Sequence, residues 1–262
     1  MRRPPSAAIF LLACAAGLAT HAATFFGGFW RDDFGILERV ERLGPAEAVA
    51  RGVTRRFLEF VNDFWRPTST ALAAAESEIF GPRPALWRAA SVALLIAAAG
   101  ALWRLMRRGA PDPRLVPALV TATFVAAPCH AESLGWTVSG QQELLALALT
   151  LWAVERFVAG SAASLLLAAL AYGAKESAFA APAWMFGAAV VLLDADARRA
   201  RRRLSVAHAA VWAATFAARL VVLGGFRRPY DPAGTGQSVA DRVVPALHGV
   251  ATALGPALTV VG

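Results

Sequence analysis

Lysine and cysteine are scarce in this chain of 262 residues. The two cysteines, Cys14 and Cys129, lie in or beside apolar segments, without a Cys-x-x-Cys pair or zinc-ligand spacing around them. We therefore expect neither a disulfide framework nor a structural zinc site. Among 26 basic residues only Lys175 is a lysine, so the chain otherwise carries its positive charge as arginine.

Charged residues are also few, at 17% of the chain, whereas 57% of the residues are hydrophobic. That composition is typical of a multi-span membrane protein and not of a soluble domain. The net charge of +8 comes from arginines in short clusters between apolar runs, where they act as topology signals. We therefore predict no nucleic-acid partner.

The apolar windows predict an all-α membrane protein, a bundle of about eight transmembrane helices with a partly helical first outer loop. The whole chain, 1–262, would form one transmembrane domain. The predicted spans lie near 7–27, 85–105, 115–129, 143–158, 163–175, 178–194, 205–224 and 243–262.

The N-terminal window has features of a cleavable signal peptide, but it is long enough to span a bilayer, which favours an uncleaved anchor with a cytoplasmic N-terminus. The last window ends at Gly262 without a polar or basic tail. We therefore expect the chain to be truncated there.

Two arginine clusters indicate which segments face the cytoplasm. One follows the second predicted span and the other follows the sixth, and they comprise Arg104, Arg107, Arg108, Arg114, Arg198, Arg199, Arg201, Arg202 and Arg203. With both clusters inside, the segments 28–84, 130–142 and 225–242 and the region of Lys175 face outward. The predicted location is the plasma membrane of a bacterium, with the functional site on the outer, periplasmic face.

The long outer loop, 28–84, contains a predicted amphipathic helix on the bilayer surface, which begins after Gly44-Pro45. Its apolar face would comprise Val49, Val53, Phe57, Phe60 and Phe64. Pro67 is expected to break this helix and to leave Trp65 and Arg66 beside the membrane.

Asp32 and Asp33 follow the first predicted span directly, beside Trp30 and Phe34. Two carboxylates at the mouth of a span are costly unless they meet a metal, a substrate or another partner. The alternative is a solvated loop in which an aspartate caps the next helix.

Further polar groups occur in the other two outward segments. His130 and Glu132 would project together only from an extended or turn backbone, and the alternative is a hydrogen-bonded pair at a helix entry. Gln141 and Glu143 lie shortly after them. Lys175-Glu176 ends an apolar segment and is either an interfacial ion pair or a phosphate-binding ammonium with a neighbouring acid.

The order of these polar segments resembles the multi-span GT-C glycosyltransferases, especially the protein O-mannosyltransferase-like enzymes and their relatives with tetratricopeptide repeats. The resemblance covers roughly residues 5–195. The matching pieces are Arg31-Asp32-Asp33-Phe34, Trp65-Arg66-Pro67, His130-Ala131-Glu132, Trp136, Ser139-Gly140 and Lys175-Glu176.

The resemblance implies an enzyme that moves a sugar from a polyprenyl-phosphate donor to an acceptor glycan, lipid or protein hydroxyl on the outer face of the membrane. It implies Asp33 as the general base, with Asp32 as its partner, and both as possible ligands of Mg²⁺ or Mn²⁺. Substrate and lipid phosphate would contact Trp65, Arg66, His130, Glu132, Gln141, Glu143, Lys175 and Glu176.

This hypothesis predicts that Asp32, Asp33, Glu132 and Lys175 converge in one outward cleft. The chain departs from the family pattern at Gln141-Gln142-Glu143, where relatives have an arginine that binds phosphate. Two other functions remain open. One is a transporter or flippase for lipid-linked saccharides, and the other is a non-catalytic membrane scaffold.

Overall fold

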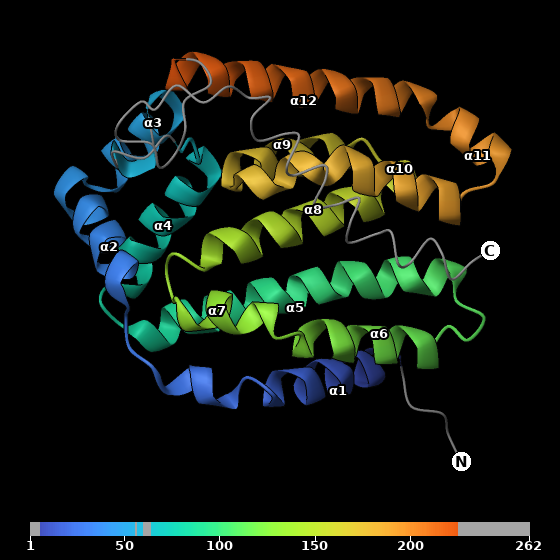
Figure 1. Ribbon diagram of the computed structural model, residues 1–262, viewed down its shortest axis with the longest axis horizontal. Helices are drawn as coiled ribbons and strands as arrows, with labels where there is room; N and C mark the ends of the chain where they lie inside the picture. The colour runs from blue at the N-terminus through green and yellow to red at the C-terminus, as the bar shows by residue number, and fades with distance from the viewer. Residues whose placement is uncertain (1–5, 56, 60–63, 225–262) are drawn as a thin grey trace, which may run out of the picture. The chain divides into compact units, whose positions relative to one another are not determined.

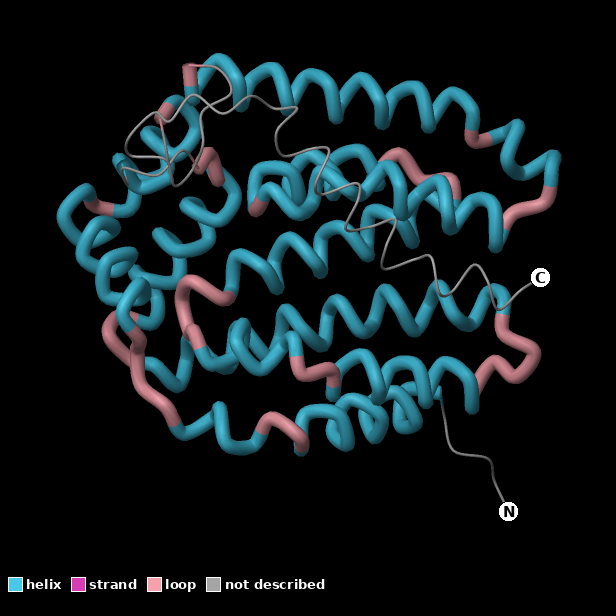
Figure 2. Tube along the Cα trace, viewed as in Figure 1, coloured by secondary structure: helices cyan, strands magenta, loops and turns pink. Residues whose placement is uncertain are grey.

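The computed structural model describes residues 6–55, 57–59 and 64–224, and within these ranges every regular element is a helix. Figures 1 and 2 show the arrangement. The first part of the chain forms α1 (Ser6–Ala19), η1 (Ala22–Phe26), α2 (Arg31–Leu43), α3 (Pro45–Thr54), η2 (Phe57–Glu59) and α4 (Pro67–Phe80). The remainder forms α5 (Pro84–Gly109), α6 (Leu115–Ala126), α7 (Cys129–Gly135), α8 (Gln141–Ala159), α9 (Ala163–Ala174), η3 (Glu176–Ala180), α10 (Ala181–Leu192), α11 (Ala195–Ala200) and α12 (Arg202–Leu223).

The longer apolar helices lie side by side and alternate in direction along the chain (Figure 1). Close packing links α1 to α6, α6 to α5, α5 to α8, α8 to α9 and α9 to α12. The short α2, α3 and α4 pack on one another, and α4 also contacts α9, α8 and α5. These three helices therefore cover one end of the bundle, which we call the polar end and define by Arg66, Gln142, Glu176 and Arg219.

The opposite end carries the arginine clusters. Arg104 and Arg108 lie near the end of α5, Arg156 near the end of α8, and Arg201 at the start of α12 against Gly160. The separation of polar segments from arginine clusters that the sequence predicts is thus present in the fold. It follows from the alternating direction of helices joined by short turns.

The expected eight spans are not supported. Within the described residues, only α5 and α12 are long and apolar enough to cross a membrane. The α6–α7 pair, bent by 56°, makes a third if it is one broken span. Helices α1, α9 and the η3–α10 segment have only 10–17 residues, fewer than the roughly 20 that a span needs. The predicted span at 243–262 lies outside the described residues.

Helix α8 has 19 residues but includes Glu143, Glu155 and Arg156. Three charged groups in one short helix make it a poor span by composition. The all-helical class and the membrane character of α5 and α12 are therefore the part of the prediction that the structure supports.

The surface helix predicted after Gly44-Pro45 is shorter than expected. Helix α3 ends at Thr54, and Phe60 lies outside the described residues. Its buried residues are Ala48 and Gly52, whereas Val49 and Val53 are exposed. The face with Ala48 and Gly52 is buried because α3 approaches α4 closely there. A Cβ on Gly52 would lie 3.0 Å from the Thr70 side chain.

Pro67 begins α4 and does not break a preceding helix. Proline is favoured at the first helical position, where its missing N–H costs nothing and its fixed φ suits the helix. Helices α3 and α5 begin in the same way at Pro45 and Pro84. Pro45, Pro67 and Pro84 therefore mark where their helices start.

Candidate functional site at the polar end of the bundle

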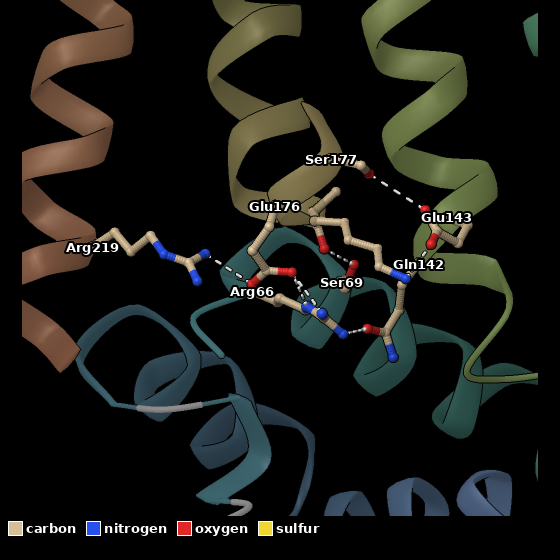
Figure 3. A network of polar contacts seen from close by, with 9 residues as sticks. Arg66, Ser69, Gln142, Glu143, Glu176, Ser177 and Arg219 are labelled. Carbon is tan, nitrogen blue, oxygen red and sulfur yellow. Dashed lines mark hydrogen bonds and ion pairs between the residues drawn. The ribbon is translucent and has the colours of Figure 1, made fainter. Parts of the chain in front are cut away.

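Arg66 lies at the centre of a polar network that joins four elements (Figure 3). It precedes α4, and its guanidinium donates from Nε and Nη2 to Glu176 Oε2, at 3.0 and 2.6 Å, and from Nη1 to Gln142 Oε1, at 2.6 Å. The ring of Phe64 lies 4.0 Å from its Cζ atom. Paired N–H donors and a stacked ring fix the plane of the guanidinium, a geometry that lysine cannot supply.

Glu176 accepts from a second arginine. Arg219, near the end of α12, donates from Nη1 to Glu176 Oε1 at 2.8 Å. Burial raises the pKa of Glu176, but the hydrogen bonds from Arg66 and Arg219 and the positive charge of Arg66 outweigh burial and lower this pKa below its ordinary value. The carboxylate is therefore ionised at neutral pH, and one negative charge faces two positive ones.

Lys175 forms an ion pair with Glu143, in the first turn of α8. Ser177 lies 3.4 Å from the other oxygen of the same carboxylate. The sequence left two interpretations of Lys175, an ion pair or a phosphate-binding ammonium. The structure contains an ion pair, but its partner is Glu143 and not the adjacent Glu176. The lysine is partly exposed, so its charge stays accessible from solvent.

A small pocket adjoins this network between α2, α4 and the start of α8. Its lining comprises Ile36, Ser69, Leu72, Ala73, Val138, Gln141 and Gln142. Gln141 donates to the Trp87 carbonyl at 2.8 Å and also hydrogen-bonds the buried Glu76. Burial raises the pKa of Glu76 to about 7, the Gln141 contact opposing the shift. This carboxyl group can therefore gain or lose a proton near neutral pH.

Asp33 is fully buried, with an exposed fraction of 0%, and all its acceptor positions are occupied. One oxygen accepts from the backbone N–H groups of Trp30 and Thr137, at 2.9 and 3.1 Å. The other accepts from those of Val138 and Ser139, both at 2.9 Å. Asp33 therefore caps the start of α2 and ties it to the segment that leads into α8.

Asp32, in contrast, is exposed. The two aspartates thus sit in opposite environments, and Asp33 has no oxygen left for a metal ion. Within the described residues no group of three or more His, Cys, Asp or Glu side chains could hold a metal. Binding of Mg²⁺ or Mn²⁺ stays a prediction. In this arrangement Asp32, and not Asp33, would be the ligand.

His130 and Glu132 do not act as a pair. Helix α7 runs through both, so they point to different sides, His130 buried and Glu132 exposed. Trp65, expected beside the membrane, is buried and donates from Nε1 to the Val53 carbonyl at 2.9 Å. These three side chains take no part in the contacts of the Arg66 network.

The expected convergence of Asp33 with Asp32, Glu132 and Lys175 in one cleft is wrong, because Asp33 is fully buried and bound by backbone N–H groups. The polar end instead joins five of the eight residues predicted to contact substrate and lipid phosphate, without Trp65, His130 and Glu132. Arg66, Glu143, Lys175 and Glu176 come together, and Gln141 lies beside them at the pocket.

Three members of the site were not predicted, namely Gln142, Arg219 and Glu76. Gln142 could have been proposed from its neighbours, because Gln141 and Glu143 were already candidates. Arg219 is a single arginine late in an apolar window, and such a residue more often faces a polar partner than lipid. Glu76 has no comparable signal, since it lies in a segment with other acids.

Comparisons of the chain with protein-family models, curated proteins and solved structures found no match.

Proposed function

We propose that this chain is a membrane glycosyltransferase that takes a sugar from a polyprenyl-phosphate donor and transfers it to an acceptor hydroxyl on the outer face of the plasma membrane. One observation carries the proposal. Arg66, Lys175 and Arg219 come from distant parts of the chain and gather at one end of a bundle of apolar helices.

The cations suit the phosphate of such a donor. Arg66 and Arg219 share a single carboxylate, Glu176, so the pair keeps an excess of positive charge. Lys175 adds a third cation, held by Glu143. During transfer the departing lipid phosphate gains negative charge, and arginine forks with a lysine stabilise that charge. The polyprenyl chain would remain among the apolar helices.

We assign the acceptor-activating carboxylate to Asp32 in place of Asp33. A general base needs a free oxygen to take the proton of the acceptor hydroxyl, and the oxygens of Asp33 already accept four N–H bonds. Asp32 is exposed and lies one turn before Ile36, which lines the pocket. Asp33 would then position the start of α2.

A second function, binding or transport of a lipid-linked saccharide without chemistry, is favoured by a different observation. In the described part of the chain, neither Asp32 nor Glu132 makes a hydrogen bond or ion pair with the Arg66 network. A site with phosphate-binding cations but no adjoining free carboxylate would hold the lipid and leave the glycosidic bond intact.

The test uses the full chain in lipid nanodiscs with a panel of radiolabelled polyprenyl-phosphate sugars, and measures binding and transfer separately. We expect Arg219→Gln and Lys175→Gln each to weaken donor binding by about tenfold, because each change removes one charge-assisted hydrogen bond. The matched control is Arg83→Gln, an exposed arginine at the same end, which should bind as the unaltered chain does.

Transfer and binding distinguish the two functions. Asp32→Asn should abolish transfer and leave binding unchanged, and transfer that survives this change would overturn the base assignment. Binding that is insensitive to both Arg219→Gln and Lys175→Gln would overturn the phosphate site. Tight, cation-dependent binding by a chain that transfers nothing to any acceptor would support the carrier or scaffold.

A further inference from the structure

We propose that the opposite end of the bundle holds a second, independent site, which binds the phosphate of an anionic phospholipid headgroup. Its residues are Arg104 and Arg108 of α5 and Glu155 and Arg156 of α8, two helices that pack along their lengths. This inference does not depend on the proposed transferase activity.

Glu155 organises the site. Its exposed fraction is 0%, and its two oxygens accept from three guanidinium groups. Arg104 Nε and Arg108 Nη2 each lie 3.0 Å from Oε1, and Arg156 Nε lies 2.5 Å from Oε2. A buried carboxylate is costly without partners, but one arginine in good geometry would already neutralise it. Two further arginine charges therefore remain uncompensated by Glu155.

The guanidinium groups also keep unused donors. Arg104 and Arg156 bind Glu155 through Nε alone, so in the described part of the chain their Nη atoms make no hydrogen bond. The ring centroid of Trp152 lies 5.7 Å from the Cζ atom of each. The side chains of Arg104, Arg108 and Arg156 are 51%, 38% and 29% exposed. Fixed, outward N–H forks of this kind match a phosphate group.

The depth of the site selects lipid over a soluble ligand. Helix α5, Pro84–Gly109, is long and apolar enough to span a membrane. Arg108 lies in its last turn and Arg104 one turn earlier, where the end of a span meets the headgroup layer. A phosphate at that depth belongs to a phospholipid, and uncompensated arginine charge favours an anionic headgroup over a zwitterionic one.

Native mass spectrometry of the full chain, released from nanodiscs of phosphatidylglycerol or of phosphatidylcholine, tests the site. We expect retained phosphatidylglycerol on the unaltered chain, about tenfold less on the double variant Arg104→Gln/Arg156→Gln, and little retained phosphatidylcholine. The control is Arg199→Gln, which removes one charge from an 83% exposed arginine at the same end. That variant should retain phosphatidylglycerol as the unaltered chain does.

Three results would overturn the proposal. The control could lose as much lipid as the double variant, which would mean diffuse attraction to a basic surface. The two lipids could be retained equally. Millimolar inorganic phosphate could displace the lipid, which would mean a site for free phosphate.

A second variant covers the case in which the double variant does not fold, as judged by its thermal unfolding. Arg104→Lys keeps the charge opposite Glu155 but loses the fork. It should unfold at the same temperature as the unaltered chain and retain measurably less phosphatidylglycerol. Undiminished retention by Arg104→Lys would also count against the site.

Discussion

Asp32 and Asp33 are adjacent in the chain, yet the first residue faces solvent and the second is completely enclosed by backbone N–H groups. The difference arises because successive side chains of a helix point about 100° apart, so only one of the two can face the segment 137–139. The carboxylate of Asp33 therefore stabilises the fold, whereas the carboxylate of Asp32 is accessible to a ligand from solvent.

Replacing Asp33 by Asn should destabilise the protein by about 2–4 kcal/mol. The amide NH₂ would face backbone donors that now meet a carboxylate oxygen, and those donors would lose a charged acceptor. Asp32→Asn should cost no more than about 0.5 kcal/mol, as expected of an exposed group. Denaturant unfolding of both variants in the same detergent provides the measurement, and equal losses of stability would contradict the assignment.

Glu76 should make stability depend on pH. Its pKa is raised from 4.5 to about 7 in the folded protein, so the folded state holds this proton more tightly than the unfolded state. The free energy of unfolding is then highest below about pH 4.5, falls as pH rises toward 7, and is level above that. The cause is burial, only partly offset by Gln141.

Glu76→Gln removes this titration. The variant should match the unaltered protein near pH 4 and be more stable at pH 8, by up to about 3 kcal/mol for a shift of this size. Glu78→Gln, an exposed position on the same helix, is the control. Thermal unfolding between pH 4 and 8 is the measurement, and a variant whose stability difference from the unaltered protein is constant over this range would contradict the assignment.

At the scale of elements, helix packing depends on small residues in the apolar helices. Gly17 of α1 lies against α6 so closely that a Cβ atom there would be 2.7 Å from Val125 Cβ and 2.9 Å from the Ala122 carbonyl. Small residues permit such close approach between apolar helices, where side-chain packing replaces the hydrophobic effect as the source of association.

Gly17→Ala should therefore destabilise the protein by about 1–3 kcal/mol, since the contact with a backbone carbonyl cannot be relieved by a side-chain rotation. Gly187→Ala in α10 is the matched control, because nothing lies within 4 Å of its added Cβ. The control should be stabilising by about 0.5–1 kcal/mol, the ordinary gain of alanine over glycine in a helix. The same sign for both variants would mean that α1 and α6 do not pack in this way.

The helices themselves were largely predictable, whereas the directions of their side chains were not. Windows of apolar residues located α5, α8 and α12 within a few residues, because apolar runs of that length are rare outside helices. A predicted helix was too long where a turn divides an apolar window. The window 115–129 is an example, because α6 ends at Ala126 and a turn at Pro128 leads into α7. The directions of His130 and Glu132 were predicted wrongly. Two residues at i and i+2 point the same way in extended or turn backbone, but they point to different sides in a helix, which α7 is.

Five residues at the polar end were predictable from their polar character in the sequence, whereas the contacts between distant residues were not. Lys175 and Glu176 are neighbours, and their polar character is visible in the sequence. Asp33 meets donors more than 100 positions away, at Thr137 and beyond, and no local pattern encodes that contact. Arg219 joins Glu176 across 43 positions and resembles an ordinary residue of an apolar segment until the helices pack.

For the whole molecule, both ends carry more positive than negative charge, but they differ in how the charges are paired. The polar end pairs arginines and a lysine with Glu176 and Glu143, whereas the opposite end gathers arginines around one buried Glu155. If α5 and α12 cross a bilayer, the two ends lie on opposite sides of it. The positive-inside rule then predicts that the arginine-rich end faces the cytoplasm and the polar end faces outward.

Single cysteines at the two ends test this orientation. In a Cys129→Ser background, Cys14 is buried and should stay unlabelled. Glu132→Cys, exposed at the polar end, should react with a membrane-impermeant maleimide on intact spheroplasts, and Asp196→Cys, exposed in α11, should react only after permeabilisation. The reverse pattern would invert the topology and place the Arg66 network in the cytoplasm. Labelling of both cysteines on intact spheroplasts would mean that α5 and α12 do not separate these ends across the membrane.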